Sequence, residues 1–179
     1  MITKQQIPNL LTFSRVLAVP LALGFMVAGA GAWPLFVVFV AAAITDFFDG
    51  YLARKWQATS PLGAMLDPMA DKLLVALMLL YFAYGTGAPL LPIALILLRE
   101  LYVAGLREAL ALRQIPLPVS RGGKWKTAVQ MLAITLLLAS LAFSYGPLWL
   151  PGIALLWLSA VLALVSAAQY TRAALTHFK

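Results

Sequence analysis

The chain has 179 residues, of which 63% are hydrophobic and only 11% are charged, and its mean hydropathy is +0.94. A soluble domain is about half apolar and a quarter charged, so this composition excludes an ordinary water-soluble protein and indicates that lipid surrounds part of the chain. The net charge of +7 does not indicate nucleic-acid binding, because the basic residues lie between apolar runs. Cysteine is absent, which excludes disulfides and leaves oxygen ligands for any metal.

Six apolar segments are long enough to cross a bilayer, for which about 20 residues are needed. Breaks rich in Gly and Pro separate the predicted spans, which are 10–29, 34–55, 68–84, 89–112, 125–145 and 148–171. Proline is favoured in the first turn of a helix, and four prolines fit that position: Pro34, Pro68, Pro89 and Pro147. We predict an all-α membrane protein with six transmembrane helices in a single domain, 1–179, whose first residues, 1–9, form a short interfacial helix.

The first apolar segment has an alternative interpretation. A polar, basic lead-in, an apolar run and the small residues Ala28 and Ala30 together imitate a secretory signal peptide. The lead-in is long for a signal peptide, and retaining the segment gives a consistent topology. We therefore favour a first transmembrane span.

The basic residues gather at alternate connections between the predicted spans. The connections near 30, 86 and 147 carry no Lys or Arg, whereas the other span ends do. This positive-inside pattern predicts a multi-pass protein of the inner (cytoplasmic) membrane, with both termini and the chemistry on the cytoplasmic side. Trp and Tyr residues near span ends are typical of interfacial anchors: Trp33, Trp56, Tyr81, Tyr84, Trp125, Tyr145, Trp149 and Tyr170.

Four of the six acidic residues fall close together, at Asp46, Asp49, Asp67 and Asp71. Carboxylates beside hydrocarbon are costly unless they are paired, hydrated or bound to a cation. The members of each pair are three or four residues apart, so each pair shares a helix face, and the two pairs can converge where spans 2 and 3 adjoin. Asp67 before Pro68 fits a helix cap. The alternative is ordinary acids at helix ends, but four carboxylates suit two Mg²⁺ or Mn²⁺ ions.

The spacing of these residues matches a family signature. The pattern Asp46-x2-Asp49-Gly50-x2-Ala53-Arg54-x8-Gly63-x3-Asp67-x3-Asp71 resembles that of the CDP-alcohol phosphatidyltransferase family at every fixed position. The resemblance implies six transmembrane helices, a cytoplasmic-facing cavity, two metal ions and a homodimer. It also implies that an alcohol attacks the lipid-bearing phosphate of a CDP-linked lipid and that CMP leaves.

The resemblance also implies residue roles. Asp46 and Asp67 correspond to ligands of both metals, and Asp49 to a ligand of one. Asp71 corresponds to a ligand of the other metal and to the general base that takes the proton of the incoming hydroxyl. Contacts to the CDP-lipid are implied for Asn9, Thr12, Gly50, Arg54 and Ser60, although Asn9 and Thr12 also fit simple cap and interface positions. Arg15 could reach a lipid phosphate.

The acceptor depends on basic residues in spans 4 and 5. Arg99 and Glu100 lie inside an apolar segment, where charged residues indicate a functional site. Glu100 shares a helix face with Arg107. A cluster of cations facing a metal site suits an acceptor that carries its own phosphate. The predicted ligands of this phosphate are Arg107, Lys124, Lys126 and Arg99. The alternative is that these residues follow the positive-inside rule or extend towards lipid headgroups.

The RE…LRE segment followed by GKWKTAVQM resembles the phosphatidylglycerophosphate synthase branch of the family. This implies CDP-diacylglycerol and sn-glycerol 3-phosphate as substrates in a lipid membrane. Two alternatives remain open: the same reaction with inositol phosphate, serine or phosphatidylglycerol as acceptor, or a small cation transporter. Transporters place ion sites near the bilayer midplane within repeats, whereas here the acids lie at predicted helix ends and no repeat is visible.

Overall fold

The computed structural model describes residues 6–56, 61–114 and 121–176, with side chains described over 14–46, 69–114 and 125–176. Within these ranges the chain forms only helices, as predicted. They are α1 (Gln6–Val27), α2 (Ala32–Trp56), α3 (Pro61–Ala83), α4 (Leu90–Ala111), α5 (Arg121–Ala142), the 3-10 turn η1 (Gly146–Leu148) and α6 (Trp149–Leu175). Gln6 to Asn9, which were predicted to belong to a separate interfacial helix, are the first residues of α1.

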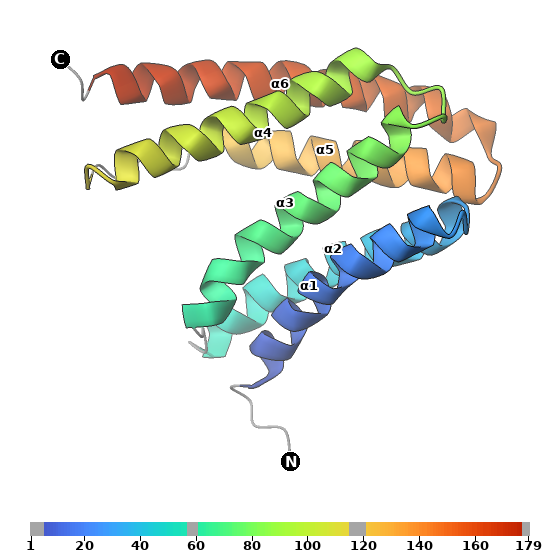
Figure 1. Ribbon diagram of the computed structural model, residues 1–179, viewed down its shortest axis with the longest axis horizontal. Coiled ribbons are helices and arrows are strands. Elements are labelled where there is room, and N and C mark those ends of the chain that lie inside the picture. Colours follow the sequence, from blue (N-terminus) through green and yellow to red (C-terminus); the bar gives the residue numbers. More distant parts are fainter. Residues whose placement is uncertain (1–5, 57–60, 115–120, 177–179) are drawn as a thin grey trace.

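The helices form two groups that meet at one end and diverge at the other (Figure 1). In the first group α1 packs against α2 and α3, and in the second α6 packs against α4 and α5. The groups are joined mainly by α2 against α5, with fewer contacts from α3 to α4 and α5. The helix ends that flank the α2–α3 and α4–α5 connections lie on the diverging side (Figure 1). These are the ends where the sequence places its basic residues.

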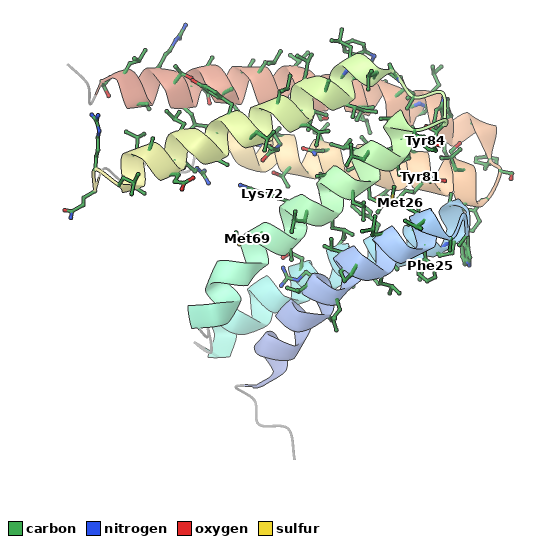
Figure 2. All side chains as sticks on the ribbon, in the orientation of Figure 1. Phe25, Met26, Met69, Lys72, Tyr81 and Tyr84 are labelled. Carbon is green, nitrogen blue, oxygen red and sulfur yellow. The ribbon has the colours of Figure 1, made fainter. Side chains whose placement is uncertain are left out.

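The predicted breaks after the first and third spans are tight turns that require glycine. Gly29 and Gly31 between α1 and α2, and Gly85 and Gly87 between α3 and α4, all have φ between 64° and 80°. Side chains with a Cβ rarely adopt this left-handed conformation, whereas glycine does so without strain. Figure 2 shows Tyr81 and Tyr84 near this turn end of α3, and Met69 and Lys72 nearer its other end.

The predicted start of the third helix is wrong. We expected Pro68 in the first turn with Asp67 as its cap, but α3 begins at Pro61 and continues through both residues. Pro61 therefore takes the first-turn position that the sequence analysis gave to Pro68. A proline inside a helix is tolerated where neighbouring groups satisfy the freed carbonyl, and Pro20 also lies inside α1. As a consequence, Asp67 and Asp71 share one continuous helix.

The core lies where the two helix groups meet. Its largest fully buried side chains include Phe39 of α2, Phe82 of α3, Ile93 of α4 and Leu137 of α5. Gly152 of α6 lies against Leu137, so close that a Cβ there would be 2.8 Å from two side-chain carbons of that leucine. The close approach of α5 and α6 thus depends on a residue without a side chain, as is common in membrane helix pairs.

Two segments of the described chain are long and apolar enough to cross a membrane, Trp125–Ala142 and Gly146–Leu175, with mean hydropathies of 1.5 and 2.2. The apolar helices Ser14–Val27 and Ala32–Asp46 are shorter within the searched ranges. Many large apolar side chains face outward, among them Leu17, Leu98 and Leu150. A soluble monomer rarely exposes so much apolar surface, so the structure is consistent with a membrane protein.

Candidate active site

Asp46, one of the predicted metal ligands, lies on α2 facing α1. Its Oδ1 accepts a hydrogen bond of 2.6 Å from Nη1 of Arg15, and this forms an ion pair. The Arg15 side chain is only 3% exposed, whereas that of Asp46 is 49% exposed. The arginine is thus fixed in the interior, and it holds a carboxylate that remains accessible to a further cation. The sequence analysis had placed Arg15 near a lipid phosphate, and this second role stays a prediction.

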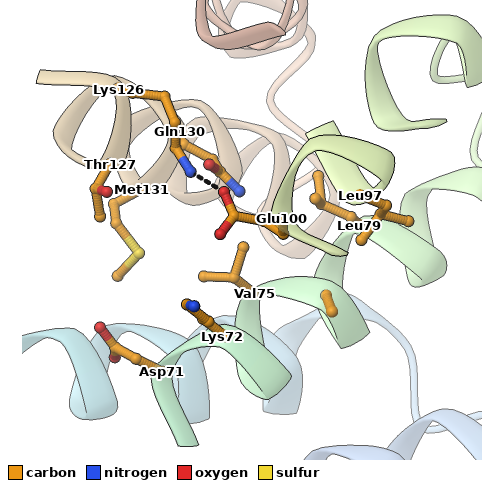
Figure 3. Close-up of a pocket in the computed structure, with 11 residues that line it drawn as sticks. Asp71, Lys72, Val75, Leu79, Leu97, Glu100, Lys126, Thr127, Gln130 and Met131 are labelled. Atoms are coloured by element: carbon orange, nitrogen blue, oxygen red, sulfur yellow. Dashed lines mark hydrogen bonds and ion pairs between the residues drawn. The ribbon is translucent and has the colours of Figure 1, made fainter. Parts of the chain in front are cut away.

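Asp71 of α3 lines a cavity of about 240 Å³ between α3, α4 and α5 (Figure 3). Apolar residues form much of its wall: Val75, Ala76, Leu79, Leu97 and Met131. Its polar lining comes from all three helices, with Asp71 and Lys72 on α3, Glu100 on α4, and Lys126, Thr127 and Gln130 on α5. The cavity therefore brings the predicted general base and one predicted acceptor-phosphate residue, Lys126, into the same space.

A carboxylate and two cations form a compact cluster on the α4–α5 side of this cavity. The Oε1 atom of Glu100 accepts a hydrogen bond from Nη1 of Arg99 at 2.8 Å and another from Nζ of Lys126. The Lys126 side chain is 6% exposed and that of Glu100 is 20% exposed. Figure 3 shows the Lys126 ammonium directed at Glu100, across the cavity from Asp71 and Lys72. Charges this deeply placed are tolerated because they are paired.

Two of the predicted acceptor residues, Arg99 and Arg107, contact α6. Nη2 of Arg99 donates to Ser166 Oγ at 2.8 Å, and Nη2 of Arg107 donates to the Tyr170 hydroxyl at 2.8 Å. Both guanidinium groups also lie over the Tyr170 ring, at 5.9 and 5.1 Å from its centre. Neither arginine is among the residues lining the Asp71 cavity. Among the described residues, the Nε atoms of both are buried without a hydrogen-bond partner.

The predicted role of Tyr170 as an interfacial anchor is wrong. Its side chain is buried between α4 and α6 and supports the two arginines. Sequence reasoning assigned no role to Ser166 and left Glu100 out of the predicted site. A usable signal was present, since Ser166 and Tyr170 are four residues apart and so share a helix face, and Glu100 directly follows Arg99 within an apolar helix.

A second hollow, of about 350 Å³, lies between α1 and α2 beside the ion pair. Its lining is mostly apolar, with Leu17 and Leu21 on α1 and Val38 on α2. Polar groups reach it from Ser14, Arg15 and Thr45. The hydroxyl of Thr45 donates to backbone carbonyls one turn back, at 2.8 and 3.0 Å. This hollow is therefore a largely apolar surface with the buried Arg15 side chain at its edge.

Several predicted site residues lie outside the described side chains. Their backbones belong to α1 for Asn9 and Thr12, to α2 for Asp49, Gly50 and Arg54, to α3 for Asp67 and to α5 for Lys124, whereas Ser60 lies outside the described residues altogether. The helical spacing on which the motif depends is confirmed at the level of the backbone. Asp46 and Asp49 share α2, and Asp67 and Asp71 share α3. How these side chains are oriented stays a prediction.

The two described aspartates are compatible with a divalent metal. Asp46 offers a half-exposed carboxylate and Asp71 offers one at a cavity wall. No group of three metal-binding side chains occurs among the residues that the structure describes, a set that does not include the side chains of Asp49 and Asp67. Hard oxygen donors are the set that Mg²⁺ and Mn²⁺ prefer, so the residues present fit such an ion.

Comparison with known proteins identifies the family of this chain. The sequence model described as CDP-alcohol phosphatidyltransferase matches residues 5–165. A Rickettsia typhi protein named CDP-diacylglycerol–glycerol-3-phosphate 3-phosphatidyltransferase is 40% identical over 178 residues, which cover 97% of this chain and 99% of that protein. A Pseudomonas fluorescens protein of the same name is 43% identical over 188 residues, covering 97% and 92%. An Oryza sativa protein named cardiolipin synthase (CMP-forming) is 40% identical over 185 residues, covering 93% and 56%. This chain belongs to the CDP-alcohol phosphatidyltransferase family.

Proposed function

We propose that this chain transfers the phosphatidyl group of CDP-diacylglycerol to sn-glycerol 3-phosphate, giving phosphatidylglycerophosphate and CMP. The observation that carries the proposal is the cavity that holds Asp71 and Lys126 together, in a member of this family. Relatives aligned over nearly their whole length are named for this reaction. A carboxylate base and a cation suited to a phosphate are the two groups that a phosphorylated alcohol acceptor requires.

The chemical step is a substitution at one phosphorus atom. Asp71 takes the proton of the acceptor hydroxyl, and the hydroxyl oxygen forms a bond to the phosphorus that carries diacylglycerol. The phosphoanhydride bond to the cytidylyl phosphate breaks, and its electron pair leaves with CMP. A positioned general base contributes about 10²- to 10⁴-fold to such a rate.

Four aspartates would hold two Mg²⁺ or Mn²⁺ ions at this centre: Asp46, Asp49, Asp67 and Asp71. When bound, such ions neutralise the charge that develops on the phosphate oxygens and leaving group. Asp46 lies ten residues before the end of α2 and Asp71 ten residues after the start of α3, about 15 Å along each helix. Because both helices pack against α1, this equal offset supports the convergence of the two pairs.

The two substrates occupy different sides of the aspartates. The CDP-lipid contacts the residues that match the family's nucleotide positions, namely Asn9, Thr12, Gly50, Arg54 and Ser60. The acceptor phosphate binds to the basic residues of α4 and α5, namely Lys126, Lys124, Arg107 and Arg99. A cavity of about 240 Å³ is smaller than the roughly 300–1,000 Å³ of sites for drug-sized ligands, which favours a small acceptor.

The protein acts as a single domain, 1–179, in the inner membrane, with its six helices spanning the bilayer. The alternation of helix direction and the basic residues at one set of helix ends support a cytoplasmic cavity and cytoplasmic termini. The family resemblance supports a homodimer.

A second acceptor has specific support. The rice relative, named a cardiolipin synthase, has the same 40% identity to this chain as the rickettsial protein, although the match covers only 56% of the rice protein, and on this ground phosphatidylglycerol is the leading alternative. Inositol phosphate and serine follow it. Family membership favours all of these reactions over cation transport.

The deciding experiment offers each acceptor in turn to the purified protein with CDP-diacylglycerol and Mg²⁺ or Mn²⁺, and measures CMP release and the lipid product. We expect release with glycerol 3-phosphate and a product with the mass of phosphatidylglycerophosphate. CMP release with phosphatidylglycerol alone would overturn the assignment of glycerol 3-phosphate as the acceptor, but it would retain the family reaction. Metal flux into liposomes without nucleotide, together with no CMP release, would overturn both.

A further inference from the structure

We propose that Glu100 is a positioning residue for acceptor recognition, and that its carboxylate fixes the Lys126 ammonium in the cavity wall opposite Asp71. The inference rests on the proposed function, in which Lys126 binds the acceptor phosphate. Glu100 itself contacts no reacting atom in this account. It acts through Lys126 and, to a smaller degree, through Arg99.

The geometry of Glu100 supports this role. Its Oε1 accepts from Arg99 on its own helix and from Lys126 on α5, so one oxygen joins two cations from two helices. All three side chains are mostly or wholly buried. Figure 3 shows the Glu100 carboxylate between the Lys126 ammonium and the part of the cavity above Val75 and Lys72. A lysine on a long flexible stem gains a defined position from such a contact.

The charge balance indicates that an anion completes the cluster. Glu100 supplies one negative charge to two cations, Arg99 and Lys126, and Lys72 adds a further positive charge to the cavity wall. Asp71 supplies the other carboxylate among the lining residues that the structure describes. A phosphate ester near neutral pH carries close to two negative charges, so it suits the α4–α5 side of the cavity. Glu100 keeps that side ordered without cancelling its positive charge.

Replacing the carboxylate alone separates positioning from shape. Glu100→Gln retains the size of the side chain and an acceptor oxygen but removes the charge that holds Lys126. An ammonium that is 6% exposed and has lost its counter-charge is destabilised, so it turns away or loses its proton, and the acceptor phosphate loses its cation. We expect the KM for glycerol 3-phosphate to rise roughly 10- to 100-fold, with the KM for CDP-diacylglycerol unchanged within about twofold.

The matched control is Glu108→Gln. Glu108 lies on the same helix eight residues further on and is exposed. The Glu108→Gln substitution removes the same charge from α4 at a position outside the cluster, and we expect both KM values to stay within about twofold of wild type. The pH dependence of kcat should be the same for wild type and Glu100→Gln, because Asp71 remains the base.

A double-mutant cycle tests whether Glu100 acts through Lys126. The four proteins are wild type, Glu100→Gln, Lys126→Gln and the double variant, all compared by kcat/KM for glycerol 3-phosphate and by melting temperature in detergent. If Glu100 only positions Lys126, adding Glu100→Gln to Lys126→Gln lowers kcat/KM by less than about threefold further. Fully multiplicative losses, or an unchanged KM in Glu100→Gln, would overturn the inference.

Folding and functional failures are distinguishable. If Glu100→Gln does not fold, the conservative Glu100→Asp keeps the charge but shortens its reach, and we expect a partial rise of the same KM. A shift in both KM values together would assign Glu100 a general structural role and overturn the proposal. If wild type itself releases no CMP with glycerol 3-phosphate, the proposed acceptor is wrong, and that result is obtained before any variant is measured.

Discussion

The α1–α3 half and the α4–α6 half of the molecule carry different chemical groups, and each half contributes some of them to the Asp71 cavity. The first half carries all four aspartates of the motif, and the structure describes the side chains of two of them: the half-exposed Asp46, paired with Arg15 of α1, and Asp71 at the cavity wall. The second half carries a network of cations held by long-range contacts, in which Arg99 and Arg107 reach α6 residues 67 and 63 positions away. In our account the first half breaks and makes bonds, and the second half chooses the acceptor.

The two halves differ in how far their functional residues can be recognised from the local sequence. Aspartates at spacings of three and four on single helices are a local pattern, because helix geometry alone brings them to one face. The cation network depends instead on how α4, α5 and α6 pack. Variants in the two halves should therefore fail in different ways, as a loss of turnover in the first and as a loss of acceptor affinity in the second.

The largest expected effect is that of Asp71→Asn in the first half. Asparagine keeps the shape but cannot take the acceptor proton, so we expect CMP release to fall about 10²- to 10⁴-fold. The measurement is CMP release at saturating concentrations of both substrates. Residual turnover within about tenfold of wild type would show that Asp71 is not the base.

Lys126→Gln in the second half should have a smaller effect of a different kind. Removing the ammonium takes away a buried cation for the acceptor phosphate, and we expect the KM for glycerol 3-phosphate to rise about 30- to 100-fold. Steady-state kinetics with each substrate varied in turn separate the two constants. An equal rise in the KM for CDP-diacylglycerol would contradict the division between the halves.

Tyr170→Phe should have a modest effect. It retains the ring beneath both arginines but removes the hydroxyl that accepts from Arg107 at 2.8 Å. The loss of one hydrogen bond costs a net of about 0.5–1.5 kcal/mol, so we expect the acceptor KM to rise about 2- to 12-fold.

The control for this change is Tyr102→Phe at the same α4–α6 contact. The Tyr102 hydroxyl is exposed and shares a 2.7 Å hydrogen bond with Thr171. Its removal should leave acceptor kinetics unchanged. If both variants behave alike, the Tyr170 effect is one of packing and not of arginine positioning.

Gly152→Ala should leave substrate affinities unchanged and affect only stability. The new Cβ would meet buried Leu137 at 2.8 Å, and overpacking of this kind costs about 1–3 kcal/mol. We expect the melting temperature in detergent to fall by about 2–10 °C. Gly105→Ala on α4, where no atom lies within 4 Å of the added Cβ, should not lower it. Equal shifts in the two variants would contradict the tight α5–α6 contact.

Much of the fold could be predicted from sequence because the signals that mark its helices and turns are local. Apolar runs gave the helices, and glycines that later proved to have positive φ, such as Gly29 and Gly85, marked the turns. The start of α3 was misplaced because Pro68 was interpreted as a helix start, although a proline can also lie within a helix whose surroundings satisfy the freed carbonyl. That each aspartate pair shares one helix was predicted correctly for the same local reason. Their predicted position at the helix ends was wrong, because Asp46 lies ten residues before the end of α2, and Asp67 and Asp71 lie within α3.

The second half of the site could be predicted only in part. The presence of Arg99 and Glu100 inside an apolar segment indicated a functional role, but their partners lie on other helices. That Tyr170 is buried beneath two guanidinium groups, and that Lys126 is joined to Glu100, follows from the packing of α4 with α5 and α6. Periodicity along one segment carries no information about which distant segment covers it.

The central claim is that the cations of the α4–α6 half recognise the phosphate of the acceptor. The most direct test compares kcat/KM for glycerol 3-phosphate with kcat/KM for glycerol, which lacks the phosphate, in wild type and in Lys126→Gln. We predict a strong preference of the wild type for glycerol 3-phosphate and a collapse of that preference by at least about tenfold in the variant. The same ratio in both proteins would contradict the account.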